Sequence, residues 1–582
     1  MHEAASEPRL RLDQIRKTIW LTRPDLQALV ASNPDTFECW LVTSGIHEYR
    51  GLAELHPKVP QELLNESAPE AINKVSPTLT RFMQGIWSLR TDLQQAFDIK
   101  TPVGQQAFIR WYFVHGVVEL GLASLLTTAQ LKWLLSAAPG MPRVPNILAL
   151  IWQGDGALQQ RYPDPGADAL RQWTREEGQT QYPILRELRR LAAGSAHDTR
   201  TANVTASHAS GDLPFGLNLI GYARGQFGIG EDVRMAARAC EAVGIPFSIY
   251  NVEPGREVSQ NDNSAEAHVS DQLPYAINLF CTTGIETARL AALEGRKLFG
   301  GRYNIGYWPW ELPRWPQEWQ HAYALVDEIW ASSRFAYQAF AGSSPVPVRH
   351  MPMAVTVDTT AHKTRQDFGL PEERFLFVFS FDFLSSLARK NPQACVEAFK
   401  CAFPKGSEPV GLVVKAMRAS EDNSLWQQLQ KDAAADGRIY IINETLSRGE
   451  VLDLYRACDG FISLHRSEGF GRGIAEAMLL GKVVITTGFS GNLDFATPGT
   501  AALVDHCLTE VQEGQYPFGK GQQWAEPSID HAAWWMRELL HDSALRSRLA
   551  RTGQQLVEAT YSPTVVGSLY ARQLVRQVNS KN

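Results

Sequence analysis

Hydrophobic residues follow two different spacings along this chain. Over residues 1–205 they recur every three or four positions, which is the spacing of an amphipathic helix, and alternating β-branched residues are scarce. From Phe215 onward, short apolar runs alternate with helical stretches, as in a parallel sheet covered by helices. The pattern therefore predicts an all-α region followed by α/β domains.

The helical region contains a repeated sequence. Residues 19–27 resemble residues 86–94, and residues 151–159 form a weaker third copy. The first Trp residues of the copies are 67 and then 65 positions apart, and each copy has a second Trp about twenty positions later: Trp20 and Trp40, Trp87 and Trp111, Trp152 and Trp173. A repeat of about 66 residues predicts three stacked helical units whose Trp side chains pack in a shared core. What such a domain binds stays open: an acceptor, a partner protein or a second copy of the chain.

The apolar runs after the helical region divide into two groups. A small, polar stretch, residues 192–213, predicts a linker between the helical domain, 1–205, and a first α/β domain, 214–358. A second α/β domain follows at 359–555. The predicted strands are 216–223, 246–252, 275–281, 303–307, 328–332 and 346–351 in the first domain, and 375–381, 411–416, 438–442, 460–464, 483–487 and 501–505 in the second.

One stretch of the second α/β domain carries the clearest candidate chemistry, SLHRSEGFGRGIAEAMLLGKVVITTGFSGNLDF at 463–495. A predicted strand leads into a loop containing Gly469, Phe470 and Gly471, and a helix follows at about 473–480. Glycines let a ligand approach the backbone, and the N-terminus of a helix attracts phosphate. Glu468 and Glu476, eight positions apart, are placed to bind hydroxyl groups of a sugar and of a ribose.

This E-x7-E segment resembles the retaining nucleotide-sugar glycosyltransferases of the GT-B fold, family 4. The resemblance implies two doubly wound Rossmann-like domains that face each other across a cleft, with a C-terminal helix, 556–582, crossing back to the first. It implies that Glu468 contacts the donor sugar, that Glu476 binds the ribose, and that no metal or cofactor is needed. The implied reaction is hexosyl transfer from a nucleotide sugar to a hydroxyl of a glycan or lipid-linked glycan, in polysaccharide or lipopolysaccharide biosynthesis.

Positive charge for the leaving diphosphate is expected after the first strand of the second domain, where Arg389 and Lys390 are read as opening a helix. Lys390 matches the lysine of the resembling family. No arginine stands at the family's spacing before it, so Arg389, Lys415 and Arg472 are the candidates to replace that arginine.

Three further segments have two interpretations each. Gly228 and Gly230 follow the first strand of the first domain and either adjoin the donor phosphates or form a plain tight turn. Trp310 and Glu311 form an acceptor-side contact or a turn packed into the core. Ser490 contributes to the donor site or caps a helix.

Composition limits the other classes of function. The chain has 582 residues, 44% of them hydrophobic, and 56 basic against 62 acidic residues give a net charge of −6, which argues against a nucleic-acid binder. Seven scattered cysteines without a C-x-x-C pair favour a reducing cytoplasm over a disulfide framework or a zinc site. The sequence shows neither the apolar core of a signal peptide nor an apolar run of about 18 residues. We therefore expect a cytoplasmic protein, with contact to the inner membrane periphery, to an assembly complex or to a homo-oligomer left open.

Two other functions compete with glycosyl transfer. Paired carboxylates also occur in glycoside hydrolases, but a glycine-rich helix start suited to phosphate has no place there. The helical repeats also fit a non-catalytic scaffold of a glycan-assembly complex that binds nucleotide sugar.

Overall fold

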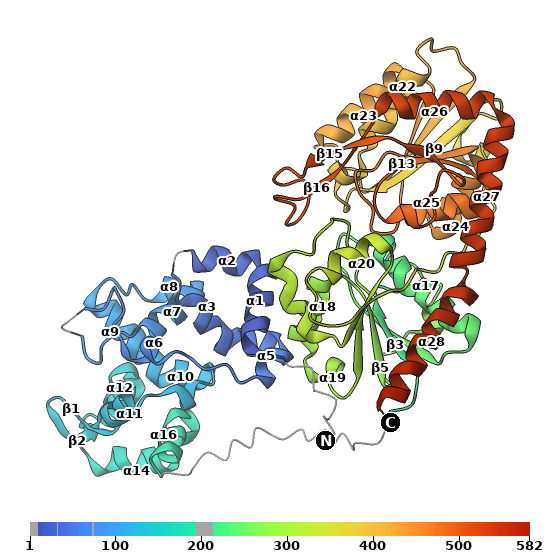
Figure 1. Cartoon of the computed structure of the whole chain (residues 1–582). Helices are drawn as coiled ribbons and strands as arrows, with labels where there is room; N and C mark the ends of the chain where they lie inside the picture. The colour runs from blue at the N-terminus through green and yellow to red at the C-terminus, as the bar shows by residue number, and fades with distance from the viewer. Residues whose placement is uncertain (1–9, 32, 73–74, 194–212, 582) are drawn as a thin grey trace. The chain divides into compact units, whose positions relative to one another are not determined.

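The computed structural model describes residues 10–31, 33–72, 75–193 and 213–581 (Figure 1). The chain divides into two compact units. One comprises Leu10–Gly211 with Arg289–Lys297, and the other comprises the rest. Nearly all of the predicted linker, 192–213, lies outside the described residues.

Short helices make up most of the first unit, and buried residues between Cys39 and Leu188 form an apolar core in it. An antiparallel pair of short strands, β1 and β2, interrupts the predicted all-α pattern. The elements are α1 Leu12–Thr22, α2 Pro24–Val30, α3 Thr36–Trp40, α4 Ile46–Glu48, α5 Arg50–Glu54, α6 Gln61–Asn65, α7 Arg81–Leu89, α8 Thr91–Ala96, α9 Pro102–Trp111, α10 Val117–Glu119, α11 Thr128–Leu135, β1 Ala137–Ala138, β2 Met141–Pro145, α12 Asn146–Gly154, α13 Gly156–Arg161, α14 Asp168–Glu176, α15 Gly178–Gln181 and α16 Ile184–Ala192.

The repeated sequence forms repeated contacts. In each copy a Gln side chain donates a hydrogen bond to the backbone carbonyl of the Trp seven positions before it: Gln27 to Trp20, Gln94 to Trp87 and Gln159 to Trp152. In the second and third copies the indole N–H of this Trp donates to the carbonyl ten positions later, over 2.9 Å each time. The three segments thus share one local structure.

The second Trp of each copy packs against a glycine five positions later. A Cβ on Gly116 would come within 2.9 Å of the Trp111 ring, and Gly45 and Gly178 have the same relation to Trp40 and Trp173. In the first two copies a π-helical turn begins directly after this Trp and ends at this Gly, Leu41–Gly45 and Tyr112–Gly116. Only a residue without a side chain leaves room for the indole ring at these positions.

The second unit contains two parallel six-stranded sheets, which confirms the predicted α/β class with two Rossmann-like domains. The first sheet has the order β4-β3-β5-β6-β7-β8, and the second has the order β11-β10-β9-β12-β13-β14. Each predicted strand is present, with ends that differ by two residues or fewer: β3 Leu217–Gly221, β4 Phe247–Asn251, β5 Ile277–Cys281, β6 Tyr303–Gly306, β7 Glu328–Ala331, β8 Val348–His350, β9 Phe375–Asp382, β10 Val410–Met417, β11 Ile439–Asn443, β12 Gly460–Ser463, β13 Val483–Thr487 and β14 Ala502–Val504.

Side-chain alternation along the strands separates two apolar layers in the second sheet. On β9, Leu376 and Val378 join the core that contains α24 (Arg448–Ala457) and α25 (Arg472–Leu479). Phe377, Phe379 and Phe381 join the core on the opposite face. The main helices of the two domains are α17 Gly228–Val243, α18 Gly284–Glu294, α19 Arg296–Phe299, α20 Arg334–Ala341, α21 Leu387–Lys390, α22 Pro392–Ala402, α23 Ser424–Ala435, α24 Arg448–Ala457, α25 Arg472–Leu479, α26 Ile529–His541, α27 Ser543–Tyr561 and α28 Pro563–Lys581.

The last helix packs on the first Rossmann-like domain. Figure 1 shows α28 lying beside α17, and the two helices are in extensive contact. Their backbones come close because Gly567 lies against the carbonyl of Ala239, where a Cβ would come within 2.1 Å. Gln573 of α28 also donates to the buried carboxylate of Glu328 over 3.1 Å. The C-terminal segment therefore ties the two domains together.

One feature of the second domain is absent from the sequence prediction. After β14 the chain forms an antiparallel hairpin, β15 His506–Glu510 and β16 Gln523–Pro527, outside the parallel sheet. Its flanking strands lack a clean alternation of apolar and polar residues, so the pattern gave no strand signal. Among the described residues, no helix has the length and apolar content needed to cross a membrane.

Candidate active site

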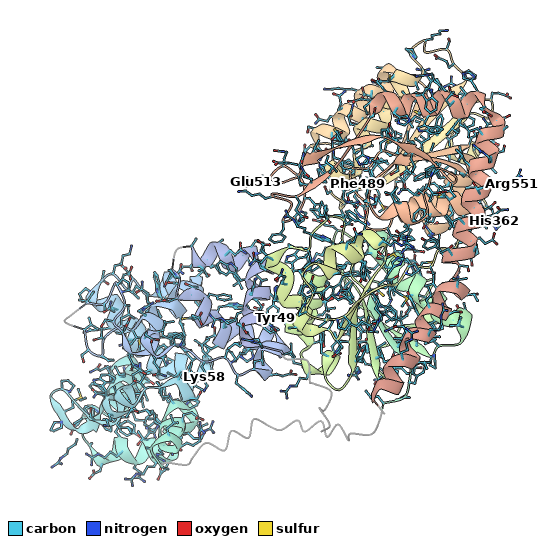
Figure 2. All side chains as sticks on the ribbon, viewed as in Figure 1. Tyr49, Lys58, His362, Phe489, Glu513 and Arg551 are labelled. Carbon is cyan, nitrogen blue, oxygen red and sulfur yellow. The ribbon has the colours of Figure 1, made fainter. Side chains whose placement is uncertain are left out.

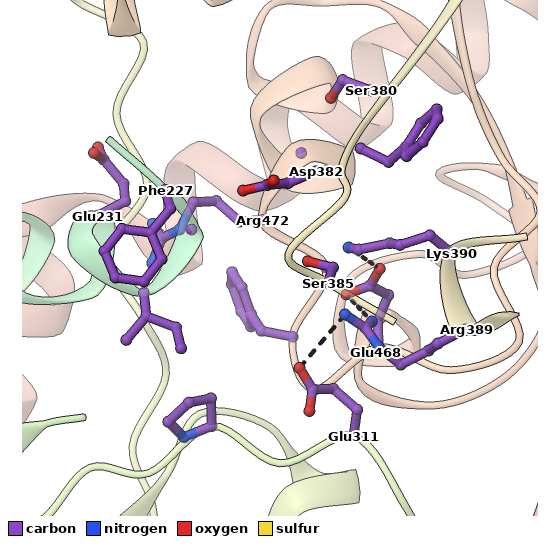
Figure 3. Close-up of a pocket in the computed structure, with 18 of the residues that line it drawn as sticks. Phe227, Glu231, Glu311, Ser380, Asp382, Ser385, Arg389, Lys390, Glu468 and Arg472 are labelled. Atoms are coloured by element: carbon purple, nitrogen blue, oxygen red, sulfur yellow. Dashed lines mark hydrogen bonds and ion pairs between the residues drawn. The ribbon is translucent and has the colours of Figure 1, made fainter. Parts of the chain in front are cut away.

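A cavity of about 820 Å³ opens at the carboxyl ends of both sheets (Figure 3). Strand order reverses beside β3 in the first sheet and beside β9 in the second, and ligands of such sheets bind at these points. The loops after β3, β6, β9 and β12 all contribute to its wall. The cavity therefore lies between the two Rossmann-like domains, where the sequence predicts a cleft.

The glycine-rich loop and the start of α25 form one side of the cavity. Gly471 precedes α25 in a left-handed conformation with φ 91°, which favours glycine. Gly491 packs so closely on this loop that a Cβ there would come within 2.0 Å of the carbonyl of Gly469. The backbone of Glu468 is fixed as well, because its N–H donates to Ser490 Oγ over 2.8 Å and its carbonyl accepts from the N–H of Gly491 over 2.9 Å.

Two cations hold the Glu468 carboxylate. Lys390 Nζ lies 2.5 Å from Oε1, and Arg389 Nη1 lies 3.1 Å from Oε2, as the dashed lines in Figure 3 show. Burial alone would raise the pKa of Glu468, but the charges of Lys390 and Arg389 outweigh it and hold the pKa at about 2. Glu468 is therefore a carboxylate over the whole physiological range of pH.

The arginine of this pair is less accessible than the lysine. Arg389 is 5% exposed and also donates to the carbonyl of Ser467 over 2.9 Å. Its second amino nitrogen lies 3.6 Å from Glu311 Oε1. The prediction that Arg389 and Lys390 open a helix is wrong: they end the four-residue helix α21, capped by Ser386. The segment between β9 and α22 is too short to show a helical spacing of apolar residues, so the sequence pattern could not locate the ends of α21.

The second acidic residue, Glu476, lies on α25 and is 2% exposed. Its Oε1 pairs with Arg448 Nη2 at 2.7 Å, and Arg448 Nε lies 3.3 Å from Glu231 Oε1 in the first Rossmann-like domain. Burial raises the pKa of Glu231, but Arg448 and Arg234 outweigh this and bring the pKa to about 2. One guanidinium thus joins the two domains at Glu476.

A second ion pair crosses between the domains nearby. Arg472, the first residue of α25, lies 2.5 Å from Asp232 Oδ1 of α17. Burial raises the pKa of Asp232 to about 6, although the Arg472 charge acts against the shift.

Lys415, near the end of β10, is 5% exposed, and burial lowers the pKa of its ammonium to about 8. Arg472 and Lys415 therefore both bring positive charge to the cavity wall.

Most of the residues predicted from the sequence line this cavity: Glu468, Glu476, Lys390, Arg389, Gly469, Phe470, Gly471, Arg472, Lys415, Gly228, Glu311 and Trp310. Gly230 and Ser490 do not belong to the wall that the described residues form. Gly230 packs under the preceding loop, where a Cβ would come within 2.3 Å of the carbonyl of Gly225. Ser490 acts through the backbone of Glu468, and its side chain caps no helix.

The aromatic segment after β6 forms the packed turn that was one of its two interpretations, and it also lines the cavity. Trp310 reaches the cavity wall but is only 2% exposed, because its ring packs edge-on against Trp315, Trp319 and Tyr516. Glu311 lines the cavity and accepts a short hydrogen bond from Tyr516. The tryptophans therefore form a rigid packed base that presents Glu311.

Sequence reasoning missed Glu231, Asp232, Arg448 and Tyr516 as parts of the site. The first two lie on α17 directly after the glycine loop, where their position at a strand's carboxyl end was an available signal. Arg448 and Tyr516 stand outside any motif. No group of three or more His, Cys, Asp or Glu placed to hold a metal ion occurs in the described part of the chain.

In a comparison with known protein families, residues 363–556 match the family described as glycosyl transferases group 1. This segment begins just before β9 and ends within α27, so it covers the second Rossmann-like domain, with Lys390, Glu468 and Glu476. The match supports glycosyl transfer as the activity of this domain. A comparison with curated protein sequences found no match.

Several solved structures are similar to part of this chain. Anabaena HepE in complex with UDP and glucose is 15% identical, with a TM-score of 0.45, over 62% of this chain and 100% of that one. Sucrose-phosphate synthase from Thermosynechococcus elongatus is 14% identical, with a TM-score of 0.47, over 63% of this chain and 100% of that one. The pneumococcal O-GlcNAc transferase GtfA in complex with UDP and GlcNAc is 12% identical, with a TM-score of 0.37, over 52% and 56%.

Proposed function

We propose that the protein is a retaining glycosyltransferase of the family 4 type, which moves a sugar from a nucleoside-diphosphate sugar to a hydroxyl of a glycan or lipid-linked glycan. One observation carries the proposal: Glu468 and Glu476 line a single cavity on either side of the N-terminus of α25, in the domain that matches group 1 glycosyl transferases. A sugar, a diphosphate and a ribose require such contacts in that order.

The diphosphate would lie between the two glutamates. The N-terminus of α25 offers backbone N–H groups and the positive end of the helix dipole. Lys390 supplies a positive charge that a ligand can reach, because 24% of its side chain is exposed. Arg389 is buried and held by Glu468, so its role is to orient that carboxylate. Arg472, which lines the cavity at the helix start and pairs with Asp232, then takes the place of the family's arginine.

The transfer step breaks the bond between the anomeric carbon and the leaving phosphate oxygen and forms a bond from that carbon to the acceptor hydroxyl oxygen. The electron pair of the broken bond stays with the diphosphate, and the acceptor's proton passes to the same phosphate oxygen on the same face of the sugar. Lys390 and the start of α25 stabilise the charge that develops on the diphosphate. Glu468 orients the sugar, and no protein nucleophile is required.

We assign the reaction to polysaccharide or lipopolysaccharide assembly in the cytoplasm, at or near the inner membrane, with the helical repeats binding the acceptor, an assembly partner or a second copy of the chain. The repeats support this assignment because stacked helical units form extended binding surfaces. The proposed reaction needs no metal or other cofactor, so activity should persist in excess EDTA.

The test is to incubate the full-length protein with a panel of UDP-, GDP-, dTDP- and ADP-sugars, with and without a crude glycan acceptor. Release of nucleoside diphosphate that depends on one donor, together with an α- or β-linked product of the donor's own anomeric configuration, is the expected result. An inverted product would refute retention. Tight nucleotide-sugar binding without any release would instead favour the non-catalytic scaffold.

A further inference from the structure

The hairpin β15–β16 brings a loop, residues 511–522, to the wall of the cavity. Gly514, Gln515, Tyr516 and Pro517 of this loop line the cavity. Ser386 Oγ donates a hydrogen bond to the carbonyl of Gln515 over 2.6 Å, and this bond attaches the loop to the second domain. From the first domain, the backbone N–H of Arg314 donates to Gln522 Oε1 over 2.9 Å. The loop is therefore fixed from both sides at the same place in the cavity.

The phenol of Tyr516 holds the carboxylate of Glu311. Its hydroxyl donates to Glu311 Oε2 in a short hydrogen bond, and its ring packs edge-on against Trp310 with centroids 5.5 Å apart. Burial and the Glu311 charge raise the pKa of Tyr516 well above its usual value, so the phenol stays protonated. Glu311 is thereby held in one orientation.

The other oxygen of Glu311 faces the group that binds Glu468. Oε1 lies 3.6 Å from Arg389 Nη2, too long for a direct hydrogen bond, while Nη1 of the same guanidinium lies 3.1 Å from Glu468 Oε2. One arginine therefore separates the two carboxylates. Since a carboxylate repels phosphate and binds hydroxyls well, this end of the cavity suits a sugar ring.

We propose that Glu311 and Tyr516 together select the sugar that is transferred, with Glu311 Oε1 and the Tyr516 hydroxyl oxygen accepting hydrogen bonds from hydroxyls of the donor's hexose. The inference rests on the proposed function and adds a specificity pair to it, one residue from each Rossmann-like domain. Arg389 fixes the distance between this pair and Glu468, so the sugar is bound from two sides. The surrounding Trp310 and Trp319 supply an apolar wall for the C–H face of the ring.

The test compares sugar nucleotides with their bare nucleoside diphosphates by isothermal titration calorimetry on the full chain. The probes are UDP-glucose, UDP-galactose, UDP-N-acetylglucosamine, GDP-mannose and dTDP-rhamnose, against UDP, GDP and dTDP. For the sugar nucleotide that wild type binds best, Tyr516→Phe and Glu311→Gln should each lower the affinity about tenfold, the loss expected for one hydrogen bond to the sugar. Affinity for the matching nucleoside diphosphate should change less than about twofold.

Both variants preserve shape, and Tyr337→Phe is the matched control because this tyrosine lies on α20, is 38% exposed and is not part of the cavity wall that the described residues form. Equal affinity of wild type and both variants for the sugar nucleotide would overturn the inference while leaving glycosyl transfer intact. So would a wild-type protein that gains no affinity from any sugar. A wild-type protein that binds no nucleoside diphosphate would refute the proposed function itself.

The order of affinities among the five sugar nucleotides is a second measurement. It should change only if the pair contacts the sugar, and not if the pair has a merely structural role. Glu311→Gln should alter the ranking, because an amide presents an N–H donor where the carboxylate presents only acceptors. A uniform loss across all sugars and all bare diphosphates would show that the pair supports the fold of the cavity and selects no sugar.

Discussion

Arg448 and Glu476 form an ion pair, 2.7 Å between Nη2 and Oε1, and the same guanidinium reaches Glu231 of the other Rossmann-like domain at 3.3 Å. Glu476, the carboxylate proposed to bind ribose, is therefore oriented by Arg448, which also contacts the opposite domain. Figure 2 shows the side chains of both domains. Since these side chains are largely buried, loss of the arginine would leave Glu476 without its ion-pair partner, while Glu231 would keep only Arg234.

Arg448→Met should weaken binding of nucleoside diphosphate about tenfold, because Glu476 would lose its fixed orientation and two buried carboxylates would repel each other. Calorimetric titration with the nucleotide that wild type prefers measures this. Arg456→Met is the matched control on the same helix, since Arg456 pairs with Asp453. Equal affinity of Arg448→Met and wild type would remove Arg448 from the site.

Glu476→Ala should also weaken nucleoside diphosphate binding, by about tenfold or more, because the ribose loses a charged hydrogen-bond acceptor. The affinity for inorganic pyrophosphate should stay within about twofold of wild type, since pyrophosphate has no ribose. An unchanged affinity for the nucleoside diphosphate would end the ribose assignment.

Glu468→Ala should reduce sugar transfer by at least about a hundredfold and leave nucleoside diphosphate binding within about threefold of wild type. The carboxylate contacts the sugar end of the cavity, so its loss affects the transition state more than nucleotide binding. Initial rates of donor consumption and a parallel titration with nucleoside diphosphate separate the two effects. Transfer at the wild-type rate would place Glu468 outside the reaction.

Glu468 should also give the protein an acid-dependent loss of stability. Its pKa in the folded protein, about 2, is below its usual 4.5, so its contribution is fully present above about pH 4.5 and is lost as the pH falls from there toward 2. Glu468→Gln should lower the melting temperature at pH 7, where Lys390 and Arg389 lose their partner. The difference from wild type should shrink below pH 4.5. A difference that is constant from pH 7 to pH 3 would contradict the assigned shift.

The Trp–Gly contacts of the helical repeat predict a pair of opposite substitutions. Gly116→Ala should destabilise the helical unit by about 1–3 kcal/mol, because its Cβ would meet the rigid Trp111 ring at 2.9 Å. Gly156→Ala, at the first turn of α13 with open space around it, should be neutral or slightly stabilising. Melting temperatures of the two variants test this, and equal values would show that the ring contact carries little energy.

The sequence determined the order and type of the elements. Alternation of short apolar runs with helical stretches is a local property, so the strands of both sheets were predicted to within two residues. The segment around Glu468 and Glu476 was also readable, because its loop, helix and strand are contiguous. The hairpin β15–β16 was not, since β15 is exposed along nearly its whole length and neither strand shows a regular alternation.

Only the tertiary structure decided which charges meet. Arg448 reaches Glu476 and Glu231, and Tyr516 reaches Glu311 across 205 positions of sequence, although no motif connects these residues. The structure likewise shows that Arg389 pairs with Glu468 and that Lys390 is the more exposed of the two cations. Side-chain periodicity records which face of an element is buried, whereas pairing of distant charges depends on how the two domains approach each other. That approach is set by packing over the whole unit, which no local pattern encodes.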